Sequence, residues 1–235
     1  MRGKGYDNKN CISDNFFNNN VSEQEKSNIR AKYNIGHDDV VIMFCGRINK
    51  DKGVKELLEA FTKMKHKDKC KLLIIGKSQF GHASTTDFEK EVQELAEQEK
   101  ERIIFTGFVH NTQLPKIHAI SDIATVPSIW NEPSGMVVIE AMASGLPVVT
   151  TNSGGIPELI TSECGFILER DNNIVYNISD KLDQLVEDEK LRQRMGQNGR
   201  DRAKEYNKKN YYHKFEEIIM TNRGRKEEIS GKELL

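Results

Sequence analysis

Two glutamates, Glu132 and Glu140, stand eight residues apart in the segment SIWNEPSGMVVIEAMASGLPVVTTNSGGIPELI, residues 128–160. The first lies in a turn with Pro133 and Gly135, and the second lies inside the apolar helix predicted to follow. A helix N-terminus carries unpaired N–H groups and a dipole that favour an anion, typically a phosphate. Because a carboxylate would repel that anion, both glutamates are expected to accept hydrogen bonds from hydroxyls. A nucleotide sugar offers both phosphate and hydroxyl groups, so it is the ligand that this segment predicts.

Two cations, Arg47 and Lys52, follow the apolar run 40–44 and are bracketed by Gly46 and Gly53. An exposed loop and helix start would explain them without any function. However, a cation near a helix N-terminus opposes the dipole, so Lys52 needs an anion close by. Arginine offers a planar fork to phosphate oxygens and lysine a mobile point charge, which favours a phosphate site.

Apolar runs alternate with amphipathic segments along the chain. Amphipathic patterns predict helices at 22–33 and around Val54–Met64, Phe88–Leu95 and Ile178–Val186. Short β-branched runs predict buried strands at 40–44, 71–75, 102–105, 122–126, 146–150 and 165–168. The alternation predicts an α/β fold, a Rossmann-like doubly wound parallel sheet. Arg47, Lys77 and Glu132 each follow a predicted strand and should meet at its carboxyl edge, where such sheets bind ligands.

The glutamate segment closely resembles the Glu-x7-Glu motif of retaining glycosyltransferases with the GT-B fold, in glycosyltransferase family 4 (glycosyl transferases group 1). The segment FCGRINKDKGVKELLEAF, residues 44–61, is similar to that family's Arg-x4-Lys pattern through Arg47 and Lys52. The resemblance runs from about Ile12 to about Ile219. It covers only the C-terminal, donor-binding half of such an enzyme.

The resemblance implies roles for individual residues. Arg47 and Lys52 would hold the donor diphosphate, and Glu132 would contact the hydroxyls of the transferred sugar. These three are the expected catalytic residues. Glu140 would hold the ribose, although a solvated helix position is the plainer interpretation. The remaining expected donor-binding residues are Val109, beside the nucleobase unless it is ordinary loop packing, and the backbone N–H groups of Gly135, Met136 and Val137.

The implied activity is transfer of a hexose from a UDP- or GDP-sugar to a glycan or lipid-linked acceptor, with retention. Lacking the N-terminal acceptor domain, this chain is expected to be inactive alone. The resemblance implies no metal and no cofactor, because GT-B enzymes use protein cations and a helix terminus instead. Two alternatives stay open: a non-catalytic sugar-nucleotide-binding module of a surface or coat assembly, and a GT-B sugar-nucleotide epimerase.

Composition sets further expectations. The 235 residues carry 35 Lys plus Arg against 36 Asp plus Glu, and this balance argues against nucleic-acid binding through phosphate neutralisation. Four scattered cysteines and the absence of an 18-residue apolar run indicate a cytoplasmic protein, with peripheral membrane association of the full-length enzyme left open.

We also predict the organisation of the chain: a linker at 1–20, a nucleotide-sugar-binding domain at 21–222 and a disordered tail at 223–235. Helix 208–222 is expected to mediate self-association through one apolar face, formed by Tyr211, Phe215, Ile218 and Ile219.

Overall fold

The computed structural model describes residues 11–18, 20–78, 86–213, 215–217 and 219–220. The predicted tail at 223–235, residues 1–10 and 19 of the predicted linker, and Ile218 lie outside the described residues. No helix in the described part of the chain is both long and apolar enough to cross a bilayer.

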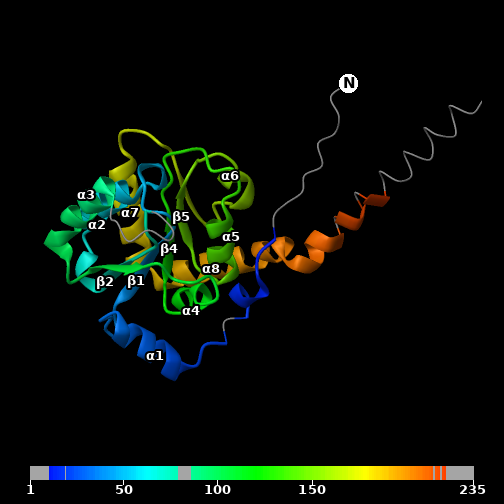
Figure 1. The fold of residues 1–235 in the computed structure, drawn as a ribbon, viewed down its shortest axis with the longest axis horizontal. Helices are drawn as coiled ribbons and strands as arrows, with labels where there is room; N and C mark the ends of the chain where they lie inside the picture. The colour runs from blue at the N-terminus through cyan, green and yellow to red at the C-terminus, as the bar shows by residue number, and fades with distance from the viewer. Residues whose placement is uncertain (1–10, 19, 79–85, 214, 218, 221–235) are drawn as a thin grey trace, which may run out of the picture.

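The centre of the fold is a six-stranded sheet in which every pair of neighbouring strands is parallel (Figure 1). Each predicted strand is present within two residues of its expected bounds. The strand order is β3-β2-β1-β4-β5-β6, which confirms the predicted Rossmann-like architecture. The strands are β1 (Val40–Cys45), β2 (Cys70–Ile75), β3 (Ile103–Gly107), β4 (Ile123–Val126), β5 (Val148–Thr151) and β6 (Gly165–Leu168).

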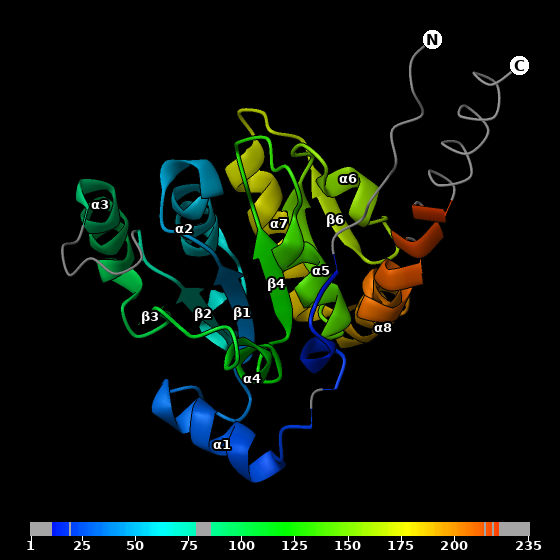
Figure 2. The ribbon, with the colours of Figure 1, turned by 45° about the vertical axis from the view of Figure 1, so that its right-hand side comes forward.

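Both faces of the sheet are buried, because successive side chains of a strand point to opposite faces. In β1, Ile42 and Phe44 join one core cluster, and Val41 and Met43 join the other. The first cluster lies under α2 (Val54–Lys63), α3 (Asp87–Ala96) and α7 (Ile174–Glu187). The second lies under α4 (Leu114–His118), α5 (Met136–Ala143) and α6 (Ile156–Leu159), as Figure 2 shows.

Helix α1 (Glu23–Lys32) matches the helix predicted at 22–33 and begins with Ser22 capping the N–H of Glu25. None of its own residues is fully buried. It is held by polar contacts: the Arg30 guanidinium donates to backbone carbonyls that include Asp39 O at 2.8 Å. Glu25 also pairs with Lys116 of α4 at 2.7 Å.

Helix α8 (Glu189–Ala203) was not among the predicted helices. Its buried face includes Gly196 and Gly199, so it lacks the apolar stripe that sequence patterns detect. A Cβ at Gly196 would lie 2.0 Å from the carbonyl oxygen of Gly145, and one at Gly199 would lie 3.3 Å from Met142. The glycines therefore let α8 approach α5 closely.

The segment expected to be a linker packs as part of the domain over residues 12–17. Ile12 and Phe16 are buried in the second core cluster. Ile12 N donates to Tyr206 O at 3.1 Å, and Arg200 donates to Phe17 O. The start of the described chain thus lies against the end of the folded body, from which a helix beginning near residue 208 leads away (Figure 1).

Candidate functional site

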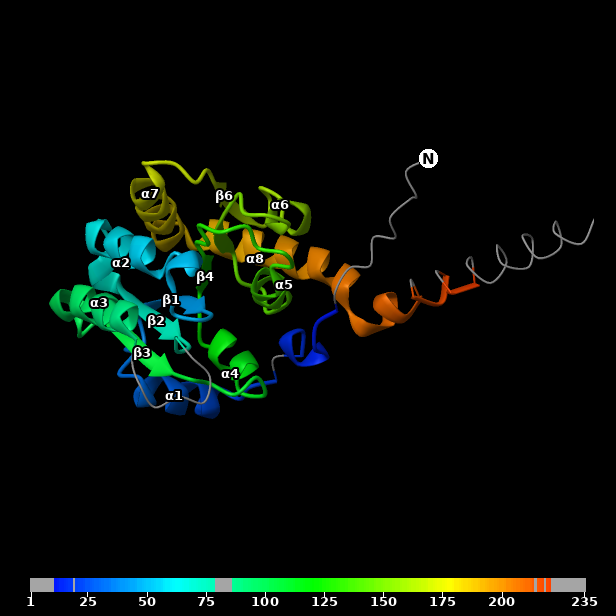
Figure 3. The ribbon, with the colours of Figure 1, turned by 45° about the horizontal axis from the view of Figure 1, so that its top comes forward.

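The strand order reverses between β1 and β4, which pair with each other at the centre of the sheet. Connections from β1 run toward β3, whereas connections from β4 run toward β6. Ligands of open α/β sheets bind at such a switch point, outside the carboxyl ends of the strands. The loop after β1 carries Arg47 and Lys52, and the loop after β4 carries Glu132. Figure 3 shows β1 and β4 between α2 and α5, the helices that these loops enter.

The two loops touch through their backbones. Asp51 O accepts from Ile129 N at 3.0 Å and from Trp130 N at 3.3 Å. Gly53 is left-handed, with φ +68°, and a Cβ there would lie 1.9 Å from Pro127 O. A side chain at position 53 would therefore force the loops apart, so glycine is required by both conformation and contact.

Lys52 and Glu132 form an ion pair across these loops, through Lys52 Nζ and Glu132 Oε1. The side chains are 24% and 10% exposed, so the pair is largely removed from water. Ser128 Oγ donates to the same carboxylate oxygen at 2.7 Å. The anion that the sequence requires beside Lys52 is thus supplied by Glu132 itself, a contact that the sequence did not reveal. Any phosphate at Lys52 competes with this carboxylate.

The backbone of Glu132 is fixed by the loop after β5. Glu132 N donates to Ser153 Oγ at 3.1 Å, and Gly155 N donates to Glu132 O at 2.9 Å. A Cβ at Gly154, where φ is +53°, would lie 2.3 Å from Glu132 O. The pair Gly154–Gly155 therefore positions Glu132. Sequence reasoning missed Ser128 and Ser153, because small polar residues at strand ends carry no spacing signal.

Helix α5 begins beside this turn, with left-handed Gly135 (φ +53°) as its N-cap. Glycine provides no side-chain acceptor, so no side chain caps the helix. Met136 and Val137 are its first residues and are half-buried. Their N–H groups belong to the orphan donors of a helix start, which suit an anion. A Cβ at Gly135 would lie 2.7 Å from Leu159 Cδ1, so α6 packs closely against the cap.

Glu140 is half-buried one turn into α5, as the sequence predicted. Burial raises the pKa of its carboxyl to about 7. Burial and the nearby charge of Glu140 together raise the pKa of the Cys45 thiol, at the end of β1, to about 12. The Glu140 carboxylate makes no hydrogen bond or ion pair within the described ranges. It is therefore an uncompensated acid, and a solvated helix position does not describe it.

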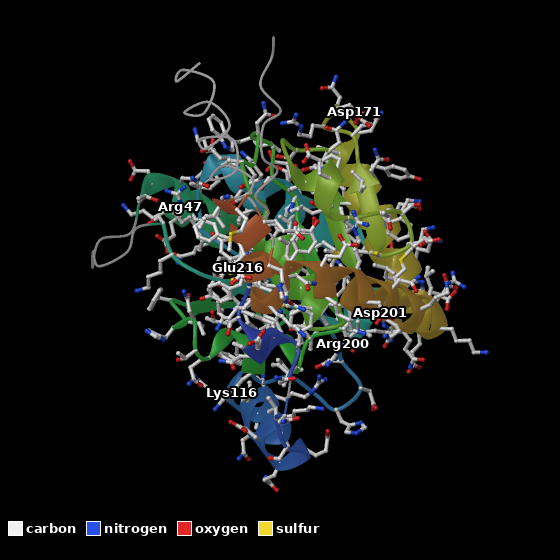
Figure 4. The ribbon with its side chains drawn as sticks, turned by 90° about the vertical axis from the view of Figure 1, so that its right-hand side faces the viewer. Arg47, Lys116, Asp171, Arg200, Asp201 and Glu216 are labelled. Atoms are coloured by element: carbon white, nitrogen blue, oxygen red, sulfur yellow. The ribbon has the colours of Figure 1, made fainter. Side chains whose placement is uncertain are left out.

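Arg47 is exposed, and its guanidinium makes no hydrogen bond or ion pair with any described residue. Figure 4 shows Arg47 and Asp171, which follow β1 and β6, in the upper half of the view, and Lys116 of α4 in the lower half. Ile48 N donates to Lys77 O at 3.2 Å and joins the loops after β1 and β2. The structure thus places Arg47 and Lys77 at the carboxyl edge, without direct contact to the Lys52–Glu132 pair.

Val109 lies farther along the same edge, in the loop after β3, two strands from β1. It lines a cavity of about 310 Å³ together with Phe108 and with Ile29 and Tyr33 from the α1 region. Glu132 is not among the residues that line this cavity. Among the described residues, no group of three or more His, Cys, Asp or Glu side chains could hold a metal ion.

The site therefore combines cations, a helix start and two carboxylates around one sheet edge. The family model of glycosyl transferases group 1 matches residues 25–202. The chain belongs to this family. It is 31% identical over 193 residues to the capsular polysaccharide biosynthesis glycosyltransferase CapM of Staphylococcus aureus, covering 76% of this chain and 45% of CapM. The chain spans about half or less of the length of the curated relatives it matches.

Two solved structures extend the comparison. The C-terminal domain of the group 1 glycosyl transferase LpcC from Francisella tularensis is 34% identical, with a TM-score of 0.62. That match covers 70% of this chain and 84% of the domain. HepE from Anabaena, solved in complex with UDP, has a TM-score of 0.76 at 22% identity, over 90% of this chain and 56% of HepE. The likeness to HepE shows the fold.

Proposed function

We propose that this chain is the donor-binding, C-terminal half of a retaining GT-B glycosyltransferase of family 4. The whole enzyme transfers a hexose from a nucleoside diphosphate sugar to a glycan or lipid-linked acceptor. The observation that carries the proposal is the meeting of Lys52 and Glu132 at the switch point of the sheet. A cation suited to a diphosphate and a carboxylate suited to sugar hydroxyls are in direct contact.

The chemistry follows from these charges. Arg47 and Lys52 offset the negative charge that builds on the leaving diphosphate as the glycosidic bond breaks. Glu132 accepts hydrogen bonds from the sugar and stabilises positive charge at the anomeric carbon. Front-side attack and a covalent intermediate are both compatible with this arrangement. The N–H groups at Gly135, Met136 and Val137 add donors to the phosphate or sugar.

Glu140 is assigned to the ribose, since two adjacent hydroxyls satisfy a carboxylate that has no other partner among the described residues. Val109 is assigned to the nucleobase through the cavity that it lines after β3. Protein cations and the α5 terminus take the place of a divalent ion, so no metal or further cofactor enters the proposal.

Two comparisons support the donor half in particular. HepE, with the same fold, has been solved with UDP and with UDP-glucose. The Francisella structure is itself a C-terminal domain, and this chain matches most of it. The family match also favours transfer over the two alternatives, a non-catalytic module and an epimerase. The isolated chain should therefore bind donor without transferring sugar efficiently.

Titration of the chain with UDP, GDP and UDP-glucose by calorimetry tests the proposal. Two charge-assisted contacts, less the entropy of binding, give an expected Kd of roughly 0.1–1 mM for the preferred nucleotide. A folded chain that binds none of the three ligands at several millimolar would contradict it. Restoring an N-terminal acceptor half and assaying sugar transfer then separates an enzyme from a binding module.

Self-association and location in the cell belong to the same proposal. Phe215 and Ile219 are 44% and 38% exposed, and Tyr211 stacks on Phe215 with ring centroids 6.4 Å apart. We place the whole enzyme in the cytoplasm, peripheral to the membrane, with this helix face covered by another copy or by the N-terminal half. Light scattering should show concentration-dependent dimers that Phe215→Glu abolishes. A monomer at high concentration, unchanged by that substitution, would exclude self-association.

A further inference from the structure

The turn that holds Glu132 also presents two apolar side chains to solvent. Ile129 is 39% exposed, and Trp130, the single tryptophan of the chain, is 56% exposed. Two neighbouring large apolar side chains exposed beside a candidate ligand site form a candidate contact surface. Trp130 makes no aromatic stacking or cation contact with any described residue.

The backbone beneath these side chains is held by three separate loops. Both N–H groups donate to Asp51 O in the loop after β1. Ile129 O accepts from Arg170, which follows β6, at 3.2 Å, and Trp130 O accepts from Ser153 in the loop after β5. A rigid backbone that carries an exposed indole loses little conformational entropy when a ligand binds it.

Glu132 and Trp130 lie two residues apart in the same turn but differ in exposure to solvent. The Glu132 carboxylate points inward, to Lys52 and Ser128, and Glu132 is 8% exposed. The Trp130 indole, two residues earlier, lies on the rim. A donor with its diphosphate at Lys52 and its sugar at Glu132 would leave the exposed side of this turn, which carries Trp130, open to the acceptor.

We propose that Trp130, supported by Ile129, is the stacking platform for a sugar ring of the acceptor. The C–H face of a pyranose is apolar and weakly positive, and it complements the negative face of an indole. A cavity of about 230 Å³ beside the platform is lined by Ile129 and Phe88, with Lys50, Lys55, Glu56 and Glu91 as its charged lining. Apolar surface bordered by charged groups suits a hydroxylated ring. The volume is below the ~300–1,000 Å³ of typical drug-sized pockets.

The alternative of membrane insertion is less well matched. Asp51 and Asn131, both exposed, lie in the two contacting loops, Asn131 directly after Trp130 in sequence. The charges around the platform are of mixed sign, with Lys50 and Lys55 beside Asp51, Glu56 and Glu91, so they do not form the basic cluster that an anionic headgroup surface attracts. The platform rests on the proposed donor site, so the test must separate the two.

Trp130 fluorescence reports on the platform directly, because the chain has no other tryptophan. In the presence of saturating UDP, titration with methyl β-D-glucopyranoside, methyl α-D-mannopyranoside and cellobiose should shift or quench the emission saturably for at least one glycoside. Saturation-transfer NMR should show Trp130→Ala weakening that glycoside at least fivefold, with Trp130→Phe close to wild type. Tyr176→Ala, which removes an aromatic 69% exposed on α7, is the matched control and should change nothing.

Calorimetry with UDP runs in parallel on every variant. One outcome would contradict the platform but not the donor site. In it, Trp130→Ala still binds UDP, and no glycoside changes the emission of the wild-type chain. Loss of UDP binding in the wild type would overturn the proposed function. A blue shift with phosphatidylcholine–phosphatidylglycerol vesicles but not with glycosides would assign Trp130 to a lipid surface. An emission that depends on protein concentration, without a glycoside response, would assign it to a second copy. Both outcomes contradict the platform.

Discussion

The turn before α5 and α5 itself each carry a glutamate, Glu132 and Glu140, but the surroundings of the two carboxyl groups are opposite. Glu132 is surrounded by partners: Lys52, Ser128 and a backbone anchored on Ser153. Glu140 sits eight residues later among apolar neighbours, with no charge-compensating partner among the described residues. One carboxylate is positioned by the protein, and the other has only burial acting on it. The difference indicates that Glu132 is pre-organised, whereas no described residue stabilises the charge of Glu140.

The largest expected effect comes from removing Lys52, the cation that pairs with Glu132. Lys52→Ala leaves Glu132 buried without its cation, and the loss of one partner of such a pair should cost roughly 3 kcal/mol of unfolding free energy. The affinity for UDP should fall about tenfold or more, while that for uridine changes little. Urea denaturation and calorimetry measure the two effects.

Two further variants serve as controls for that result. Lys63→Ala, an exposed lysine at the end of α2, should change the unfolding free energy by no more than ~0.5 kcal/mol. Lys52→Ala combined with Glu132→Gln should recover part of the stability, because no buried charge remains unpaired. Equal losses of UDP and uridine affinity in Lys52→Ala would remove its phosphate role.

Neutralising Glu132 should have the next largest effect, because it frees Lys52 from its carboxylate partner. Because Glu132 competes with phosphate for Lys52, Glu132→Gln should tighten UDP binding about fivefold, or ~1 kcal/mol. The same variant should lose any preference for UDP-glucose over UDP, since a carboxylate acceptor for the sugar is gone. Parallel calorimetric titrations of both ligands suffice. Weaker binding of UDP by the variant would show that the ion pair holds the site together rather than competing with the ligand.

Glu140 gives a smaller effect that depends on pH. Its folded-state pKa of about 7 lies above the ordinary value of 4.5, so the folded chain keeps the proton longer than the unfolded chain does. Unfolding free energy should therefore fall as pH rises from about 4.5 to 7, and this fall should be absent in Glu140→Gln. The neighbouring Cys45 thiol does not contribute to this pH dependence, because its pKa is raised to about 12 and it stays neutral in this range. Urea titrations at pH 5 and pH 8 of both proteins test this, and parallel pH slopes would refute the shift.

The affinity for ligand should depend on pH in the opposite direction to the unfolding free energy. If ribose hydroxyls stabilise the Glu140 carboxylate, affinity for UDP-glucose should rise as pH increases through 7, with proton release. UDP-glucose is the right probe, because its diphosphate diester does not titrate in this range, whereas the terminal phosphate of UDP does. In Glu140→Gln the affinity should be lower and independent of pH.

The sequence predicted the sheet well, for physical reasons visible in single strands. Runs such as VVIMF and KLLII are buried on both faces, so they contain uninterrupted apolar residues. Helix α8 escaped prediction because glycines, rather than large apolar side chains, form much of its contact with α5. The packing of Ile12 and Phe16 escaped because an Asn-rich segment with isolated apolar residues looks like a linker.

The site was predictable in parts. The apolar neighbours of Glu140 are visible in the sequence, and in the structure burial raises the pKa of its carboxyl. The direct contact between Lys52 and Glu132 spans 80 positions and arises only because β1 and β4 are adjacent in the sheet. No local pattern encodes that adjacency. The supports from Ser128 and Ser153 depend on the same long-range pairing.

One backbone contact has a mechanical consequence. Because Ile12 N bonds to Tyr206 O, the start of the described chain is tied to the turn after α8, next to the helix that begins near residue 208. A force applied through the helix that begins near residue 208 would therefore act on Ile12 as well as on α8.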